Sequence, residues 1–356
     1  MRIRFTSPIN GDILNRHDGC ETPEGLRIAV KGRCPANEPV TVNGQPAEVK
    51  GREFSATVCL ADRETVLCAA GCDSTDTVTL LYNRNSFKRY RFSLDDNVWF
   101  LRDITRQAPR SLFDNPYLAL WRRLHERYGT KANFNIYYQC EGFNLSMMPD
   151  RYRGEWQDNA DWLRITFHAL QNDPKEPYIR ATYDEIGHDF DLVTNEIARF
   201  AGATALNPFT TIHWVEATRD GCRALRDRGI QGLCGFFSLG QDGRPRVAYY
   251  LDADQARHLK GRDCWKDTGE DMLFILLDIV VNNVARDKIA PHLEAIAANP
   301  QQRDLMEVMI HEQYFYPGYE AYMADYAERC EATVRWLSEN NYRPVFYSDG
   351  FMGVPE

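Results

Sequence analysis

The feature that most constrains the fold is a change of pattern near Asn85, where short β-rich runs give way to alternating strand and helix patterns. Helical periodicity is found at 116–129, 183–202, 217–229 and 322–341. The predicted strands between these helices are 90–96, 132–138, 161–168, 209–214, 230–237, 278–283, 307–313 and 344–350. Such alternation implies parallel strands joined by crossover helices. Seven or eight strands over about 270 residues favour a closed, distorted (β/α) barrel over an open sheet.

The first 85 residues have an all-β pattern instead. Short runs such as GLRIAVKG and ETVLCAAG are separated by Gly, Pro, Asn and Asp, and Asn43-Gly44 is a strong hairpin signal. The pattern resembles a small immunoglobulin-like sandwich of the accessory kind attached to carbohydrate-active enzymes. We therefore expect two domains, an immunoglobulin-like β-sandwich at 1–86 and an α/β barrel at 87–356.

Charge and composition exclude several classes of partner. The net charge is -9 with a pI near 5.5, and basic residues do not cluster with aromatic ones, so we expect no nucleic-acid binding. The longest apolar run, Met272–Val281, contains Asp278 and is too short for a bilayer, so we expect no membrane partner. The start of the sequence has no signal-peptide pattern, which predicts a cytoplasmic protein. Nothing in the sequence indicates an oligomeric state.

The ten cysteines contain no C-x-x-C pair, which argues against a thiolate zinc site. Free thiols in a reducing cytoplasm are the simplest interpretation. Five of the cysteines lie within the first 72 residues, and a disulfide among these stays an alternative.

Acidic and imidazole side chains gather at the ends of predicted strands. Asp95 and Asp96 end the first strand, and His168, His213 and His311 end or follow later ones. In a (β/α) barrel, the carboxyl ends of the strands form one face, where the chemistry takes place. Two acids and three imidazoles on that face have the composition of a zinc site with general acid and base groups.

Each residue also has a purely structural interpretation. The Asp95-Asp96 pair can be a solvated turn, His168 a hydrogen-bonded core histidine, and His213 a ring stacked on Trp214. Their shared position at one edge of the predicted barrel is what favours a functional site.

The stretch FSLDD (92–96), followed by LALWRRLHERYGTKANFNIYY (118–138), resembles the opening of the polysaccharide deacetylase family. That family begins its catalytic domain with a strand ending in T-F-D-D, followed by a helix and a kYGvkATFF strand. The resemblance extends over about residues 88–350. It implies a barrel of the polysaccharide deacetylase type and a metal-dependent carbohydrate deacetylase.

The resemblance also implies roles for four residues. Asp95 corresponds to the general base and Asp96 to a metal ligand. His168 matches the first histidine of the family's H-x-x-x-H metal motif. His311 matches the histidine that protonates the leaving group.

Two departures from the family pattern concern the metal site. The second motif histidine is replaced by Asn172, and the Arg-Pro-Pro-Tyr motif is absent. An amide oxygen binds zinc poorly compared with imidazole. We expect His213 to complete the ligand set from a strand end, with His188 as the alternative.

The predicted function is a metal-dependent hydrolase, with zinc as the divalent metal, that removes an N- or O-acetyl group from a carbohydrate. Side chains near the strand ends are expected to contact the substrate, namely Trp99, Trp214, Glu312 and Tyr314. Three alternatives stay open: a non-catalytic carbohydrate-binding protein, an amidohydrolase acting on a small non-sugar amide, and a glycoside hydrolase that uses Glu312 with Asp95 or Asp96.

Overall fold

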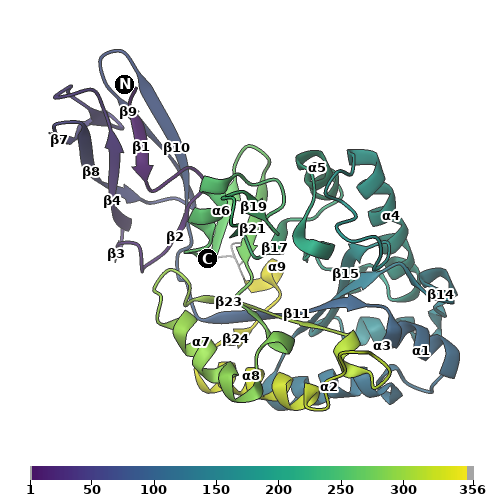
Figure 1. Ribbon diagram of the computed structural model, residues 1–356. Coiled ribbons are helices and arrows are strands. Elements are labelled where there is room, and N and C mark those ends of the chain that lie inside the picture. The colour runs from purple at the N-terminus through teal and green to yellow at the C-terminus, as the bar shows by residue number, and fades with distance from the viewer. Residues whose placement is uncertain (1, 351–356) are drawn as a thin grey trace. The chain divides into compact units, whose positions relative to one another are not determined.

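The computed structural model describes residues 2–350, which divide into two compact units (Figure 1). The first unit comprises 2–87 together with 264–273. The second comprises 88–263 and 274–350. Together, the described residues form a mixed α/β structure, as the sequence predicts.

The first unit contains two five-stranded sheets, with β1-β4-β8-β7 plus β3 in one and β2-β10-β9-β5-β6 in the other. Their strands are β1 (Arg4–Ser7), β2 (Ile13–Leu14), β3 (Cys20–Thr22), β4 (Gly25–Arg33), β5 (Thr41–Val42), β6 (Gln45–Pro46), β7 (Glu48–Lys50), β8 (Glu53–Leu60), β9 (Glu64–Ala70) and β10 (Thr75–Tyr82). The segment 264–273, with β20 (Cys264–Asp267), is counted with this unit.

Alternation of apolar and polar residues explains how these strands pack. In β4, every second side chain from Leu26 onward is buried, and side chains of both sheets, such as Phe54 and Leu80, share one hydrophobic cluster. Asn43 and Gly44 join β5 to β6 with φ values of 48° and 77°, so the predicted hairpin turn is confirmed.

The second unit is built around parallel strands in the order β15-β12-β11-β23-β22, with β24 also paired to β11. The strands are β11 (Arg89–Asn97), β12 (Ala132–Tyr137), β15 (Leu163–Ala169), β22 (Ile279–Val280), β23 (Leu305–His311) and β24 (Arg343–Pro344). A second group has the order β16-β17-β21, with β16 (Phe209–Thr210), β17 (Gly232–Gly235) and β21 (Met272–Leu276). Short hairpins are formed by β13 (Gln139–Cys140) with β14 (Phe143–Asn144) and by β18 (Ser238–Leu239) with β19 (Pro245–Arg246).

Helices cover these strands, with α2, α7 and α8 on one side and α4 and α5 on another (Figure 1). The helices are α1 (Trp99–Gln107), α2 (Pro116–Tyr128), α3 (Arg153–Asp158), α4 (Tyr183–Phe200), α5 (Arg219–Asp227), α6 (Ala253–Leu259), α7 (Ile289–Ala297), α8 (Tyr326–Glu339) and α9 (Tyr347–Gly350). The longest, α4, begins with a capping box between Thr182 and Glu185. Its predicted apolar face is buried.

Two predicted strands differ from the structure. In the run 209–214, only Phe209–Thr210 is a strand, and His213–Val215 forms a 3₁₀ turn. In the run 344–350, Tyr347–Gly350 is helical, and the Tyr347 hydroxyl donates a hydrogen bond to buried Glu307 at 2.7 Å. In both cases the tertiary contacts of the side chains outweigh a β-like local pattern.

Within residues 2–350, no helix combines the length and the apolar character needed to cross a bilayer. All ten cysteines lie in this range and are free thiols.

Candidate metal centre and active site

The two adjacent acids at the end of β11 lie at an irregularity of the strand. The pairing of β11 with β12 shifts between Leu94 and Asn97, and Asp96 has a φ of 62°. A bulge of this kind redirects one side chain at a strand end, and Asp is among the residues that tolerate the left-handed region. Asp95 stays in register opposite His311 of β23 and is 1% exposed. The local backbone therefore separates the directions of two neighbouring carboxylates.

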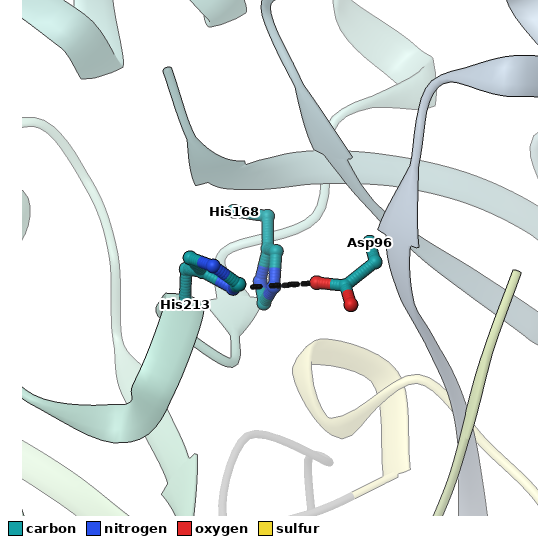
Figure 2. Close-up of side chains that lie close together, drawn as sticks. All are labelled: Asp96, His168 and His213. Carbon is teal, nitrogen blue, oxygen red and sulfur yellow. Dashed lines mark hydrogen bonds and ion pairs between the residues drawn. The ribbon is translucent and has the colours of Figure 1, made fainter. Parts of the chain in front are cut away.

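Asp96, His168 and His213 point toward one another, as Figure 2 shows, and their ligand atoms all lie within 4.8 Å of one another. Asp96 Oδ1 lies 3.0 Å from His168 Nε2 and 3.3 Å from His213 Nδ1. The two rings are almost completely buried, and the Asp96 side chain is 14% exposed. The three residues come from the ends of β11 and β15 and from the turn after β16.

Backbone carbonyls fix the orientation of both imidazole rings. His168 Nδ1 contacts the carbonyl oxygen of Thr211, and His213 Nε2 lies 3.0 Å from the carbonyl oxygen of Asn172. Because a carbonyl only accepts hydrogen bonds, each of these nitrogens must carry a hydrogen. In the neutral rings, the nitrogens facing Asp96 are therefore unprotonated, which is the state that binds metals.

This donor set fits a divalent metal ion. Two unprotonated nitrogens and a carboxylate oxygen are electron-pair donors, so their close approach is favourable when they share a cation. Two ligands of one tetrahedral zinc ion lie about 3.3 Å apart. The distances of 3.0 and 3.3 Å from Asp96 Oδ1 match that spacing.

The closeness of these side chains also shifts the pKa values of Asp96 and His168. Burial opposes ionisation of Asp96, but the close contacts with His168 and His213 hold its pKa well below its usual range. Burial alone would lower the pKa of His168, yet the neighbouring Asp96 and Asp95 raise it. Positive charge is therefore favoured at the place where the three residues meet.

Asn172 and His188 are placed differently from His213. Asn172 contributes its backbone carbonyl to His213, while its side-chain nitrogen lies 3.1 Å from Asp173 Oδ2. His188 is exposed on α4 and lines another cavity, next to Asp189. Among the described residues, the group of side chains able to hold a metal contains His213 and lacks His188.

Tyr137, the last residue of β12, is a member of the site that sequence reasoning missed. Its hydroxyl contacts Asp96 Oδ1 and lies 2.9 Å from His213 Nδ1, and the residue is 1% exposed. Burial and the charge of Asp96 raise the pKa of Tyr137 well above its ordinary value. Its position at a strand end is the one available signal in the sequence, but tyrosine is not among the usual zinc ligands.

A chain of buried amides holds Asp95 in place. The side-chain amide of Asn207 donates to Asn133 Oδ1, Asn133 donates to Asn135 Oδ1 at 2.7 Å, and Asn135 donates to Asp95 Oδ1. The Ser93 hydroxyl also donates to Asp95 Oδ1, at 2.8 Å. Asp95 Oδ1 thus accepts two hydrogen bonds, from Ser93 and from Asn135, which fix the orientation of the carboxylate.

His311 is oriented by a neighbour from a different part of the chain. Its Nδ1 lies 3.0 Å from Asn282 Oδ1, and the same oxygen accepts the His311 backbone N–H at 3.2 Å. With Nδ1 held in this way, Nε2 is the nitrogen available for proton transfer.

Glu312 is completely buried at the start of α1. Its carboxylate accepts hydrogen bonds from the backbone N–H groups of Val98, Trp99 and Phe100, at 2.6, 2.9 and 2.6 Å. Burial raises the pKa of Glu312 to about 7, against the lowering effect of these donors. This geometry favours a role in anchoring the helix over the substrate contact expected from the sequence.

The other expected substrate contacts are aromatic. Trp99 packs edge-on against Tyr316, with ring centroids 5.3 Å apart. The Tyr314 ring lies 6.0 Å from that of His311. Trp214 is 41% exposed and has a φ of 65°, directly after His213.

A cavity of about 570 Å³ opens beside Asp96. Asp96 and Tyr137 line it together with Trp99, Tyr319 and Gln171. Aromatic and amide side chains around a carboxylate suit a polar ligand with apolar ring faces.

Comparison with known proteins adds solved structures only, because neither a scan of protein-family models nor a search of curated proteins finds a match. A protein of Mycobacterium smegmatis assigned to the polysaccharide deacetylases is 9% identical, with a TM-score of 0.42, over 72% of this chain and 84% of its own. The carbohydrate deacetylase Agd3 is 8% identical, with a TM-score of 0.39, over 93% of this chain and 71% of its own.

A mutant of a CE4-family pseudoenzyme, with restored enzymatic activity, is 11% identical, with a TM-score of 0.31, over 76% of this chain and 74% of its own. Solved structures similar to this chain thus include polysaccharide deacetylases, the family that the sequence resembles.

Proposed function

We propose that this chain is a metal-dependent hydrolase that removes an N- or O-acetyl group from a carbohydrate. The observation that carries the proposal is the convergence of Asp96, His168 and His213 beside a cavity that Asp96 lines. In each imidazole, the outer nitrogen, which is the one that faces away from Asp96, is bonded to a backbone carbonyl. These three residues would hold the metal, with zinc as the ion that suits two imidazoles and a carboxylate. When bound, the ion supplies a positive charge that polarises an acyl carbonyl and makes water more acidic.

Two further residues have the geometry of a base and an acid. Asp95 Oδ1 is occupied by Ser93 and Asn135, so Asp95 Oδ2 is the oxygen left to accept a proton from water. His311 Nε2 would protonate the departing amine or alcohol, because Asn282 holds Nδ1. Asp95 and Asp96 thus act differently although they are neighbours in sequence.

The surroundings of the metal-binding side chains favour a carbohydrate longer than one sugar. A second cavity of about 640 Å³, lined by Tyr178 and His188, shares Gln171 and Asp173 with the first. Together, the two cavities offer amide and carboxylate groups for hydroxyls and aromatic rings for sugar faces. Trp99 and Tyr314 remain the proposed aromatic contacts near the scissile bond, with Trp214 on the exposed side of His213.

We also propose that the second unit is a distorted (β/α) barrel. Hydrogen bonds between the main sheet and the second group of strands support closure, because Asn207 N donates to Ile165 O at 3.1 Å and Asp278 N donates to Glu307 O at 3.0 Å. For the first unit, two sheets around one core support the proposed immunoglobulin-like sandwich. The proposed domain boundaries stay at 1–86 and 87–356.

The proposal is tested by measuring zinc content and the release of acetate from an N-acetylated amino-sugar oligomer and from an O-acetylated xylan-type oligomer. Wild-type protein should bind one zinc per chain and release acetate from at least one of them. Asp96→Ala should weaken zinc binding on the order of 10²-fold or more, because a ligand is lost. Asp95→Asn should keep the zinc and lose turnover by about 10²–10⁴-fold.

Three results would count against this function. Stoichiometric sugar binding without zinc would favour a non-catalytic carbohydrate-binding protein. Reducing sugar without acetate would favour glycoside hydrolysis. Zinc retained at full affinity by Asp96→Ala would contradict the ligand assignment.

A further inference from the structure

The imidazoles proposed to hold the metal have no N–H group left to donate toward the cavity, and the Tyr137 hydroxyl can supply a donor there. The N–H group on the outer nitrogen of His168 is bonded to the Thr211 carbonyl, and that of His213 is bonded to the Asn172 carbonyl. Neither ring can donate toward the cavity while its other nitrogen binds a metal. The Tyr137 hydroxyl can, because its O–H is not needed to orient either ring.

The hydroxyl also lies at the centre of the site. Its partners are Asp96 Oδ1, His213 Nδ1 at 2.9 Å and Nε2 at 3.3 Å, and Asn172 Oδ1 at 3.4 Å. Two of these partners, Asp96 Oδ1 and His213 Nδ1, are electron-pair donors whose lone pairs a metal would use. Their ligation would leave the O–H free to turn to another acceptor.

The tyrosine is held rigidly and faces the substrate cavity. Its ring packs edge-on against His213 with centroids 5.1 Å apart and lies 5.2 Å from the His168 ring. It belongs to the residues that line the cavity, as does Asp96. A buried donor fixed by packing stabilises a developing charge without reorganisation, and such a donor typically contributes about 10²–10³-fold to kcat.

We propose that Tyr137 is a catalytic residue whose hydroxyl donates a hydrogen bond to the oxyanion that forms when water adds to the acyl carbon. This inference rests on the proposed deacetylase function and adds a side chain to it. No covalent bond to Tyr137 forms, and its proton stays on the phenol oxygen throughout. The hydroxyl would help to stabilise the tetrahedral state together with the positive charge held by Asp96, His168 and His213.

The test is Tyr137→Phe, which removes one oxygen and keeps the ring. We expect kcat for acetate release to fall about 10²–10³-fold, with little change in KM and with zinc content unchanged. The matched control is Tyr90→Phe, which removes a buried hydroxyl on β11 that contacts Thr130 Oγ1 at 3.1 Å. Tyr90→Phe should leave kcat unchanged.

A second measurement does not depend on turnover. Methylphosphonate is a tetrahedral anion that resembles the acetyl group after attack by water, and its Kd for the zinc-loaded protein is measured by calorimetry. Tyr137→Phe should bind it at least about tenfold more weakly than wild type, because a hydrogen bond to an anion is lost.

The outcomes separate the inference from the proposed function. An unchanged kcat and an unchanged Kd for methylphosphonate in Tyr137→Phe would overturn the role of Tyr137. Loss of zinc in parallel with activity would also overturn it, because the hydroxyl would then act through Asp96. Wild-type protein that binds zinc and methylphosphonate but releases no acetate would contradict the deacetylase function. Weaker binding of the anion by Tyr137→Phe would in that case still support the donor role.

Discussion

At the scale of single residues, the site depends on backbone groups as much as on side chains. His213 is held by the carbonyl of Asn172, so the side chain at position 172 is not what orients the ring. The resemblance to the deacetylase family draws attention to Asn172 as a lost ligand. In the structure, His213 belongs to the turn after a different strand and lies beside Asp96. Residue 172 contributes its backbone carbonyl, which is bonded to His213 Nε2.

A comparison of three variants tests this arrangement. Asn172→Ala should keep zinc affinity within about two- to threefold, because the backbone carbonyl remains. His213→Ala should lose affinity on the order of 10²-fold or more, because a ligand is removed. His188→Ala serves as the control and should behave as wild type. Zinc affinity is measured by competition with a chromophoric chelator, and a large loss in His188→Ala with none in His213→Ala would reverse the assignment.

The limits of sequence reasoning at this scale are visible in Tyr137 and Glu312. The strand-end residues of metal-binding type in the sequence include Asp96, His168 and His213, and the structure brings these three side chains together. Sequence reasoning could not find Tyr137, because a tyrosine at a strand end is most often packing. It also could not show that the Glu312 carboxylate turns to the N-terminus of α1, since that contact joins residues more than 200 positions apart.

At the scale of elements, α1 links β11 to β23. The helix begins two residues after Asn97, where β11 ends, and no side-chain cap at its N-cap residue Val98 satisfies its first N–H groups. Glu312, directly after β23, accepts three of those hydrogen bonds. The position of Trp99 beside the cavity therefore depends on a residue next to His311.

Replacement of this anchor gives a prediction about stability. Glu312→Gln replaces one acceptor oxygen by an N–H₂ group that faces backbone donors, and should destabilise the protein by about 2–3 kcal/mol. The cost is measured as the free energy of unfolding in urea, with Glu126→Gln as the control. Glu126 makes an exposed ion pair with Arg122 on α2, so its replacement should cost less than about 0.5 kcal/mol.

The pH dependence of Glu312 has a defined sign. Burial raises its pKa from 4.5 to about 7, so folding favours the protonated form. The stabilisation that comes from protonated Glu312 is fully present below pH 4.5 and is lost as the pH rises through 7. The loss in the free energy of unfolding amounts to up to about 3 kcal/mol. Wild-type protein should therefore lose more stability than Glu312→Gln between about pH 5 and about pH 8. Parallel curves for the two proteins would show that the three N–H donors keep Glu312 ionised in the fold.

Regular elements were predicted best where one side of the element meets the core. The apolar residues of α4 repeat with helical spacing, and all five of the predicted positions are buried, namely Ile186, Phe190, Val193, Ile197 and Phe200. The strand predicted over 344–350 is wrong at Tyr347–Gly350, which forms a short helix. In this helix the Tyr347 hydroxyl donates a hydrogen bond to Glu307. Glu307 is itself held by buried Arg91 at 2.6 Å. A local pattern contains no information about such a buried ionic partner.

At the scale of the whole molecule, the composition indicates the sign of the charge, and the structure shows where part of it lies. The net charge is -9, and the two adjoining cavities are lined by more acids than bases. The acids are Asp96, Glu141, Asp173, Asp184, Glu185 and Asp189, and the one arginine is Arg180. A carbohydrate that carries carboxylates or sulfates would meet repulsion on approach to this region.

This distribution predicts a salt-dependent preference between substrates. At about 0.01 M salt, where the Debye length is about 30 Å, an acetylated oligomer that contains uronic acids should have a higher KM than a neutral one of equal length. At about 1 M salt, the Debye length falls to about 3 Å and the two KM values should converge. The KM of the neutral oligomer should change little, which makes it the internal control.

The lining acids can be tested directly with Asp184→Asn, because Asp184 lies on α4 and lines the second cavity, whose lining contains none of the proposed metal ligands. Removal of one negative charge should lower the KM of the uronic-acid oligomer at low salt and leave that of the neutral oligomer unchanged. An anionic oligomer that binds better at low salt than at high salt would contradict the prediction. It would mean that the positive charge of the metal centre dominates the field over the substrate, so that the surrounding carboxylates serve to hold the site together and do not select the substrate.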